Sequence, residues 1–171
     1  MRVACLVLAI VAVLVTAPNT RSGGGATYRI DHVTDGDTVA LQNGEKIRLV
    51  QIDTPEVFFG TECYGPQASA TTKRLLPEGT RVRLLPEPAT DRIDGYGRLL
   101  RYVVRADDNV DINIRLVALG AAQPYFYDGR RGMYANRLEA LTKRARAKHL
   151  GLWGACPRTK YDPYAGVATE R

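Results

Sequence analysis

Two glycine-containing turns constrain the fold of this chain more than any other feature. Asp35-Gly36 and Asn43-Gly44 favour tight β-turns, and each lies between short runs in which hydrophobic and polar residues alternate. The runs predict three strands, over residues 28–33, 38–41 and 46–53. Because tight turns join antiparallel neighbours, the start of the second strand and the end of the third should lie at one edge of the sheet.

The rest of the chain adds two predicted strands and three helices. The strands cover residues 80–85 and 98–104; the helices run from Pro66 to Leu76, around Leu116 to a left-handed stop at Gly120, and from Tyr134 to Gly151. Five short strands with these helices are typical of an α+β fold, a five-stranded Greek-key barrel of the OB type with three helices. Such barrels commonly bind nucleic acids or oligosaccharides, so the fold indicates a binding surface but no particular reaction.

The chain divides into four segments. Residues 1–22 resemble a signal peptide or an N-terminal anchor, residues 23–27 a Gly-rich linker, residues 28–157 the OB-type domain, and residues 158–171 a flexible C-terminal tail. The length of 171 residues favours a single folded domain. No feature indicates a stable protein partner, so we expect a monomer.

The apolar leader indicates export. The run from Val3 to Val15 is too short to span a bilayer easily, and small residues at a potential cleavage site follow it, although Pro18 is unfavourable there. We therefore expect a secreted protein. The alternative is that residues 3–17 are retained as a membrane anchor, with the domain facing outside; only then would the membrane be a partner.

Removal of the leader would also remove Cys5 and leave Cys63 and Cys156 as a pair. In an oxidising compartment we expect these two residues to form a disulfide, which ties the segment after the third strand to the end of the domain. The alternative is two separate buried thiols. A zinc site is not indicated, because the two histidines of the chain lie far apart in the sequence.

The charge of the chain indicates a polyanionic partner. Its net charge of +6 and its isoelectric point near 9.4 suit nucleic acid or an anionic surface. A basic face on the last helix, with Arg137 and Lys143 among its cations, can also be no more than a solvated outer surface.

Acidic residues collect at the predicted edge of the sheet. Asp53 and Glu56 follow the third strand, and Asp37 precedes the second. Two carboxylates 4 Å apart repel each other by about 4 kcal/mol at an effective dielectric constant near 20, so a cation among them is favoured. Carboxylates, a backbone carbonyl such as that of Thr54, and water form an all-oxygen set that suits calcium, with magnesium or manganese also possible. The alternative is that Asp53 caps a turn before Pro55.

Two arginines lie at strand ends near the same edge. Arg48 and Arg98 could bind a phosphate bidentately, while a carboxylate that does not hold the cation, such as Glu56, orients or deprotonates a water molecule. Together these groups predict metal-assisted phosphodiester hydrolysis. The alternative is a set of ordinary surface salt bridges, each worth about 0–1 kcal/mol.

These residues resemble the staphylococcal nuclease (thermonuclease) family. The similarity rests on Asp35-Gly36-Asp37-Thr38, the run from Arg48 to Glu56, the run from Tyr64 to Ala68, and the segment from Asp91 to Arg98, and extends from about Tyr28 to Trp153. The resemblance implies an OB barrel with three helices. It also implies a calcium-dependent nuclease that acts on both DNA and RNA and leaves 3′-phosphates.

The resemblance also implies a role for each residue. Asp37, Asp53 and the Thr54 carbonyl correspond to calcium ligands, and Asp35 lies just outside them. Glu56 corresponds to the general base or water-orienting residue, and Arg48 and Arg98 to the arginines that bind the scissile phosphate. Three tyrosines correspond to nucleotide contacts: Tyr96, Tyr125 and Tyr127.

One departure from the family pattern bears on the site, because the loop from Thr90 to Gly97 is longer and places Ile93-Asp94-Gly95 before Tyr96. A rival interpretation is a catalytically weak OB-fold module that binds nucleic acid or a protein; the presence of both arginines and all three acids argues against it. A third interpretation is a membrane-held structural domain that uses calcium only for stability.

Overall fold

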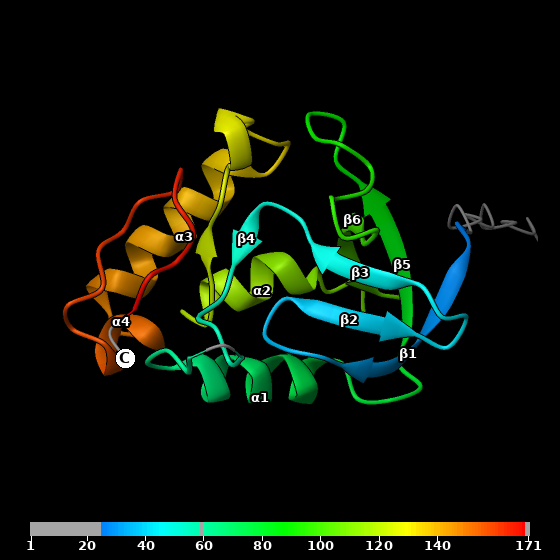
Figure 1. The fold of residues 1–171 in the computed structure, drawn as a ribbon, viewed down its shortest axis with the longest axis horizontal. Coiled ribbons are helices and arrows are strands. Elements are labelled where there is room, and N and C mark those ends of the chain that lie inside the picture. The colour runs from blue at the N-terminus through cyan, green and yellow to red at the C-terminus, as the bar shows by residue number, and fades with distance from the viewer. Residues whose placement is uncertain (1–24, 59, 170–171) are drawn as a thin grey trace, which may run out of the picture.

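A closed barrel of five strands forms the centre of the structure, a computed structural model that describes residues 25–58 and 60–169 (Figure 1). The strands follow the order β1, β2, β3, β6, β5 around the barrel. Their bounds are β1 Thr27–Val33, β2 Thr38–Leu41, β3 Lys46–Leu49, β5 Arg81–Pro86 and β6 Leu99–Arg105. This architecture confirms the predicted OB-type α+β fold. The predicted leader, residues 1–22, lies outside the described residues.

The pairing of the strands brings parts of β2, β3 and β6 together at one end of the barrel. In the antiparallel pair of β2 and β3, Thr38 lies opposite Arg48. β3 then pairs parallel with β6, where Arg48 lies opposite Leu100, and this pairing closes the barrel. The start of β2, the middle of β3 and the start of β6 therefore meet at one end of the barrel.

The third strand ends earlier than predicted. It stops at Leu49 rather than Asp53, because Gln51 has a φ of 64°, a left-handed conformation that interrupts the strand. The Gln51 amide is buried and bonded to the 130–132 loop: it donates to the Arg130 carbonyl at 2.9 Å and accepts the Gly132 N–H at 2.6 Å. Beyond the break, β4 (Ile52–Asp53) pairs with β7 (Gln123–Pro124) in a separate two-stranded sheet.

The three predicted helices are present, with one addition. They are α1 (Gly65–Leu75), α2 (Ile112–Ala118) and α3 (Ala135–Ala147), and a short α4 (Leu152–Ala155) follows; the turn η1 covers Tyr127–Gly129. Gly120, with a φ of 69°, follows α2 as predicted. The helix α3 ends at Ala147, before the predicted stop at Gly151, and the left-handed residue that follows it is His149, with a φ of 50°. In Figure 1, α2 lies between the barrel and the pair α3 and α4. No helix in the described part of the chain is long and apolar enough to cross a membrane.

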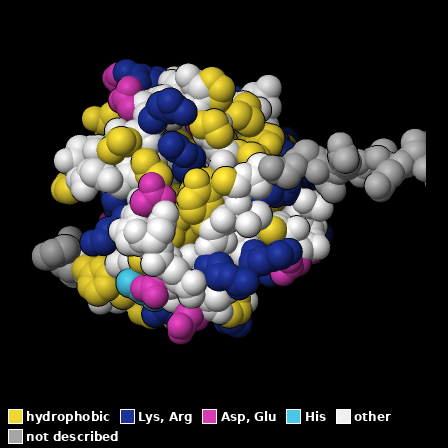
Figure 2. All heavy atoms as spheres, turned by 90° about the vertical axis from the view of Figure 1, so that its right-hand side faces the viewer, with side chains coloured by type: hydrophobic (Ala, Val, Ile, Leu, Met, Phe, Trp, Pro, Cys, Tyr) yellow, Lys and Arg dark blue, Asp and Glu magenta, His cyan; other side chains and the backbone are white. Residues whose placement is uncertain are grey.

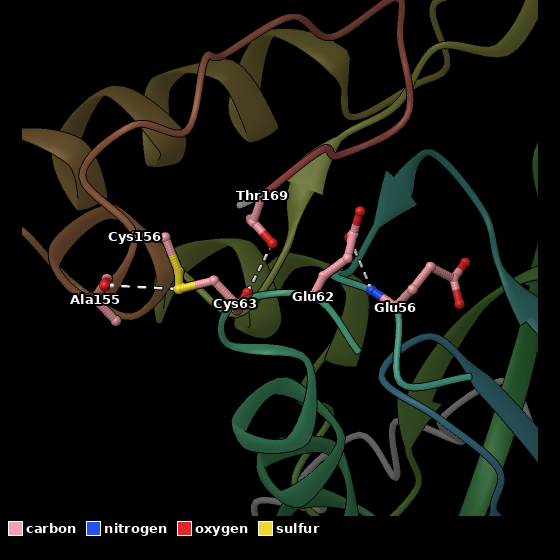
Figure 3. The surroundings of a disulfide bond; sticks show 6 residues. All are labelled: Glu56, Glu62, Cys63, Ala155, Cys156 and Thr169. Carbon is pink, nitrogen blue, oxygen red and sulfur yellow. Dashed lines mark hydrogen bonds between the residues drawn. A yellow bond between two sulfur atoms is a disulfide. The ribbon is translucent and has the colours of Figure 1, made fainter. Parts of the chain in front are cut away.

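Two hydrophobic clusters stabilise the molecule. The larger one fills the barrel and the space beneath α1, α2 and α3, with fully buried side chains such as Ile47, Leu116 and Leu138. The smaller one gathers around Trp153 and Cys156. Beside it the structure contains the Cys63–Cys156 disulfide, which joins the segment before α1 to the residue after α4 (Figure 3).

The C-terminal segment is not a loose tail. Residues 158–169 contain no helix or strand, as the lack of periodicity indicates, but they run back along α3 towards β7 (Figure 1). Val167 and Thr169 are buried, and Thr169 Oγ1 donates to the Cys63 carbonyl at 2.9 Å. Single backbone and side-chain contacts hold this segment, and such contacts leave no periodic pattern in a sequence.

Basic side chains are exposed on the barrel. On the side that carries β1 and β5, Lys and Arg side chains gather in several groups beside a band of hydrophobic side chains (Figure 2). This distribution agrees with the +6 charge of the chain. The same face also carries Asp and Glu side chains, so it is the positive charge of the whole chain, rather than of this face alone, that favours polyanions.

Candidate active site

The site begins with the turn between β1 and β2. Asp35 Oδ1 accepts the backbone N–H groups of Asp37 at 3.1 Å and Thr38 at 2.7 Å, so the Asp35 side chain forms the turn itself. A Cβ atom on Gly36 would lie 2.3 Å from Thr54 Oγ1, and the Gly36 carbonyl accepts a hydrogen bond from Thr72. Glycine therefore allows this turn to lie directly against the segment that follows β4.

Asp37 is held from that segment. Its Oδ2 accepts hydrogen bonds from both the backbone N–H of Thr54, at 3.0 Å, and its hydroxyl group, at 3.1 Å. Only 6% of the Asp37 surface is exposed. The two predicted ligand residues, which lie 17 positions apart in the sequence, are thus in direct contact.

Arg48 lies between the two aspartates. Its Nε is 3.0 Å from Asp37 Oδ1, and its Nη2 is 2.5 Å from Asp53 Oδ1. Its Nη1 donates to the carbonyls of Leu49 and Ile52, both at 2.8 Å, which the break at Gln51 turns towards the guanidinium. Arg48, a strand side chain, thus forms a partly buried bridge between two carboxylates.

Burial shifts the pKa values of these groups. It raises the pKa of Asp37 to about 7; the Arg48 guanidinium opposes this shift, and the carboxylates of Asp53 and Asp35 add to it. Burial likewise raises the pKa of Asp53, and it raises the pKa of Glu56, where Asp37 and Asp35 add repulsion. Burial would lower the pKa of Arg48, but the surrounding carboxylates outweigh it and raise that pKa, so Arg48 stays charged.

The donor set at this point fits a hard divalent cation. Asp37 and Asp53 offer carboxylate oxygens on either side of one guanidinium, and calcium prefers oxygen ligands. No group of three or more His, Cys, Asp or Glu side chains within residues 25–58 and 60–169 is arranged to hold a metal. Further ligands would therefore come from backbone carbonyls, such as that of Thr54, and from water.

Arg98 enters the site from the start of β6. Its Nη1 donates to Thr38 Oγ1 at 3.2 Å, and Thr38 Oγ1 in turn donates to Asp37 Oδ1 at 3.3 Å. The Asp94 carboxylate accepts hydrogen bonds from the Nε of Arg98, at 2.7 Å, and from the backbone N–H of Arg98, at 2.9 Å. Burial acts against the charged form of Asp94, but the hydrogen bonds from Arg98 and from the Tyr96 backbone outweigh it and lower its pKa.

Two clefts meet at Arg98 and Tyr96. The first, with a volume of about 620 Å³, is also lined by Asp35, Glu56 and Phe58. The second, with a volume of about 770 Å³, is instead lined by residues that include Arg48, Tyr125, Tyr127 and Arg130. The structure thus places Glu56 on one side of Arg98, and Arg48 and the tyrosines on the other.

The tyrosines of the second cleft are available to a ligand. Tyr96 is 88% exposed, its ring lies against Arg98 with the guanidinium carbon 5.2 Å from the ring centre, and Tyr127 is 67% exposed. The rings of Tyr125 and Tyr127 are 6.1 Å apart. Exposed rings beside cations are typical of surfaces on which nucleic acid bases stack.

The sequence patterns missed two residues that shape the site. Asp94 positions Arg98, and its place four residues before an arginine at a strand start was the available signal. The Glu62 side chain accepts a hydrogen bond from the Glu56 backbone N–H at 3.0 Å and so holds the backbone of Glu56 in place (Figure 3). No local sequence pattern indicates this contact.

The sequence of this chain is similar to those of known proteins. Residues 46–155 match the model of the family described as staphylococcal nuclease homologue. The chain is 35% identical over 135 residues to "Thermonuclease" of Staphylococcus intermedius, which covers 75% of this chain and 77% of that protein. It is 31% identical over 130 residues to "Endonuclease YncB" of Bacillus subtilis (strain 168), covering 72% of this chain and 60% of that protein.

Proposed function

The chain belongs to the staphylococcal nuclease family and is a phosphodiester-hydrolysing nuclease, and from this premise we propose that it is a secreted, calcium-dependent enzyme that cleaves both DNA and RNA. We further propose that it leaves 3′-phosphates. The observation that carries the proposal is the Arg48 guanidinium between the buried carboxylate of Asp37 and the partly buried carboxylate of Asp53, with Arg98 and Glu56 on the adjoining clefts. A surface salt bridge would not require this burial.

The substrate phosphate binds between the two arginines. Arg98 is held by Asp94 and Thr38 with its guanidinium at the junction of the two clefts, and Arg48 lines the second cleft. Two guanidinium groups stabilise the charge that develops on a pentacoordinate phosphorus. A calcium ion held by Asp37, Asp53 and the Thr54 carbonyl would supply further positive charge to the phosphate oxygens.

Glu56 activates the attacking water molecule. It is exposed in the first cleft, and its raised pKa brings it closer to neutral pH than an ordinary glutamate, which suits a general base. As the water oxygen bonds to phosphorus, its proton passes to Glu56. The bond from phosphorus to the 5′-oxygen breaks, and the leaving oxygen takes up a proton from solvent water, so the products are a 3′-phosphate and a 5′-hydroxyl. Glu56 then returns its proton to solvent.

Stacking supports action on both DNA and RNA. Tyr96, Tyr125 and Tyr127 offer ring faces to bases, and the arginines offer charge to phosphates. Neither interaction distinguishes ribose from deoxyribose, because both contacts avoid the 2′ position. Secretion is supported by the apolar leader and by the Cys63–Cys156 disulfide, since disulfides persist mainly in oxidising compartments.

Cleavage assays of the purified protein test the proposal. Incubation with DNA and with RNA, in calcium or in excess chelator, should show chelator-sensitive cleavage of both, and the products should carry 3′-phosphates by mass spectrometry. Glu56→Gln should lower turnover by about 10²- to 10⁴-fold. Glu78→Gln is the matched control, because Glu78 is exposed and lines neither cleft. Full activity of Glu56→Gln would refute the assigned base, and cleavage that ignores chelator would refute the metal.

A weak nucleic-acid-binding module is the second candidate, and the same assay decides it. That candidate predicts binding of labelled oligonucleotides without cleavage in calcium. Mass spectrometry of the protein recovered from culture medium and from membranes tests secretion against retention of residues 3–17 as an anchor. Recovery of the intact chain in membranes would contradict secretion.

A further inference from the structure

Residues 161–169, which we call the strap, run along β7 and reach Asp53. It begins after the region that matches the nuclease family, which ends at residue 155. The Pro163 carbonyl accepts the Phe126 N–H at 2.7 Å. The fully buried side chain of Gln123 donates to the carbonyls of Asp162, at 3.1 Å, and Ala165, at 3.2 Å. These contacts fix the strap along β7.

The strap reaches Asp53 through its backbone. The Val167 N–H donates to Asp53 Oδ2 at 2.7 Å. A Cβ atom on Gly166 would lie 3.2 Å from the same oxygen, so the absence of a side chain permits this close approach. The other oxygen of Asp53, Oδ1, faces Arg48 at 2.5 Å. The strap and the guanidinium therefore hold the Asp53 carboxylate from opposite sides.

Among residues 25–58 and 60–169, few other contacts fix Asp53. It is the last residue of β4, a strand of two residues whose partner is β7. Within that sheet Asp53 lies opposite Gln123, the residue whose side chain binds the strap. The strap therefore supports Asp53 twice, directly through Val167 and indirectly through Gln123.

The far end of the strap is anchored at the disulfide. The Val167 side chain packs in the cluster that contains Trp153 and Cys156, and Thr169 Oγ1 bonds to the Cys63 carbonyl (Figure 3). Both cysteines of the disulfide thus lie beside the strap. Val167 lies between the part of the strap that Gln123 holds and Thr169, which bonds to Cys63. Its N–H group therefore has little freedom to move.

We propose that the Val167 N–H is a positioning group for the cation site, because it holds Asp53 Oδ2 and so keeps Oδ1 turned towards Arg48. The inference rests on the proposed function, in which Asp53 is a calcium ligand. Hydrogen bonds to a ligating carboxylate fix its orientation, and loss of such a partner costs about 10- to 100-fold in metal affinity or activity.

Two variants at one position separate positioning from packing. Val167→Pro removes the N–H group, whereas Val167→Ala keeps it and trims the packed side chain. Calcium affinity is measured by titration calorimetry on the purified full chain, and thermal unfolding is followed in parallel. We expect Val167→Pro to bind calcium at least 10-fold more weakly. Val167→Ala should unfold at a lower temperature but bind calcium within about twofold of wild type, because the N–H group that orients Asp53 remains.

A pair of truncations covers the case in which proline disturbs folding. A chain that ends after Ala165 loses Val167, and a chain that ends after Thr169 keeps it. Fluorescence of Trp153, the single tryptophan, reports whether the strap is docked. The shorter chain should show altered fluorescence and at least 10-fold weaker calcium binding, and the longer chain neither.

The outcomes distinguish the inference from the function on which it rests. Wild-type calcium affinity in Val167→Pro, or in the chain that ends after Ala165, would overturn the positioning role and leave the proposed function intact. A calcium affinity that fell in step with the unfolding temperature across all variants would also overturn the positioning role. Absence of calcium binding by the wild-type protein would overturn the proposed calcium dependence, and the positioning role with it.

Discussion

Arg48 links the two buried or partly buried aspartates of the site. A carboxylate as buried as Asp37 is costly to ionise, and the Arg48 guanidinium offsets this cost for Asp37 and Asp53 together. The same guanidinium lines the cleft in which we place the substrate phosphate. One residue thus offsets the burial of both carboxylates and is placed to bind the substrate.

Asp37 should make the stability of the metal-free protein depend on pH. Its pKa is about 3.8 in an unfolded chain and is raised to about 7 in the fold. A raised pKa contributes stability that is fully present below pH 3.8 and is lost as the pH rises towards 7. Between these values, unfolding free energies from denaturant titrations in chelator should therefore fall more with pH for wild type than for Asp37→Asn, by up to about 1.4 kcal/mol per pH unit. Equal slopes for the two proteins would contradict the shift.

Asp94 should affect catalysis without affecting the metal. Asp94→Asn removes the charge that aligns the Arg98 guanidinium, and misplacement of a phosphate-binding group can cost up to about 10²-fold in rate. We expect turnover of DNA in saturating calcium to fall at least tenfold, with calcium affinity unchanged.

Asp108→Asn is the control for Asp94, because Asp108 also pairs with an arginine nearby in the sequence, Arg105, but lines neither cleft. It should retain turnover within about twofold of wild type, since it leaves Arg98 untouched. A similar loss in both variants would mean that a general loss of structure, rather than the position of Arg98, sets the rate.

At the scale of elements, the site depends on how closely the β1–β2 turn approaches the end of β4. Gly36→Ala would place a Cβ atom 2.3 Å from Thr54 Oγ1, so one of the two segments must move. We expect a loss of about 1–3 kcal/mol in unfolding free energy, as for other overpacked sites. Calcium affinity should fall too, because Thr54 holds Asp37.

Gly95→Ala provides the comparison for the turn. Gly95 has no heavy atom within 4 Å of an added Cβ, so this change adds a methyl group in open space. Denaturant unfolding and calcium titration of the two variants give the result. Wild-type stability and calcium affinity in Gly36→Ala would show that the turn can shift without disturbing Asp37.

The elements themselves differ in how well the sequence predicts them. The hairpins could be predicted because Asp35-Gly36, Asn43-Gly44 and the alternating runs around them are local signals. The break at Gln51 could not, because residues 49–52 are all buried and a left-handed glutamine depends on partners about 80 positions away. The charged residues of the site could be placed at one edge, but the Arg48 bridge that results from this break could not.

At the scale of the whole molecule, the barrel and the α3–α4 unit are linked on both sides of the site. β4 and β7 connect them on one side, and the Cys63–Cys156 disulfide connects the start of α1 to the end of α4 on the other. The strap runs between these links and contacts both, through Gln123 and through Cys63. The orientation of Asp53 is therefore a property of the assembled molecule.

Removal of the disulfide should weaken the fold and the site to different degrees. The two cysteines are 93 positions apart, and a loop of that size contributes about 4–5 kcal/mol to stability in the chain-entropy model. We expect the double variant Cys63→Ser/Cys156→Ser to lose stability of that order in denaturant unfolding. Calcium affinity should fall only severalfold, because Gln123 and Phe126 still hold the strap near Asp53. If the folded double variant instead bound calcium as weakly as Val167→Pro, the disulfide anchor would be the main support of Asp53.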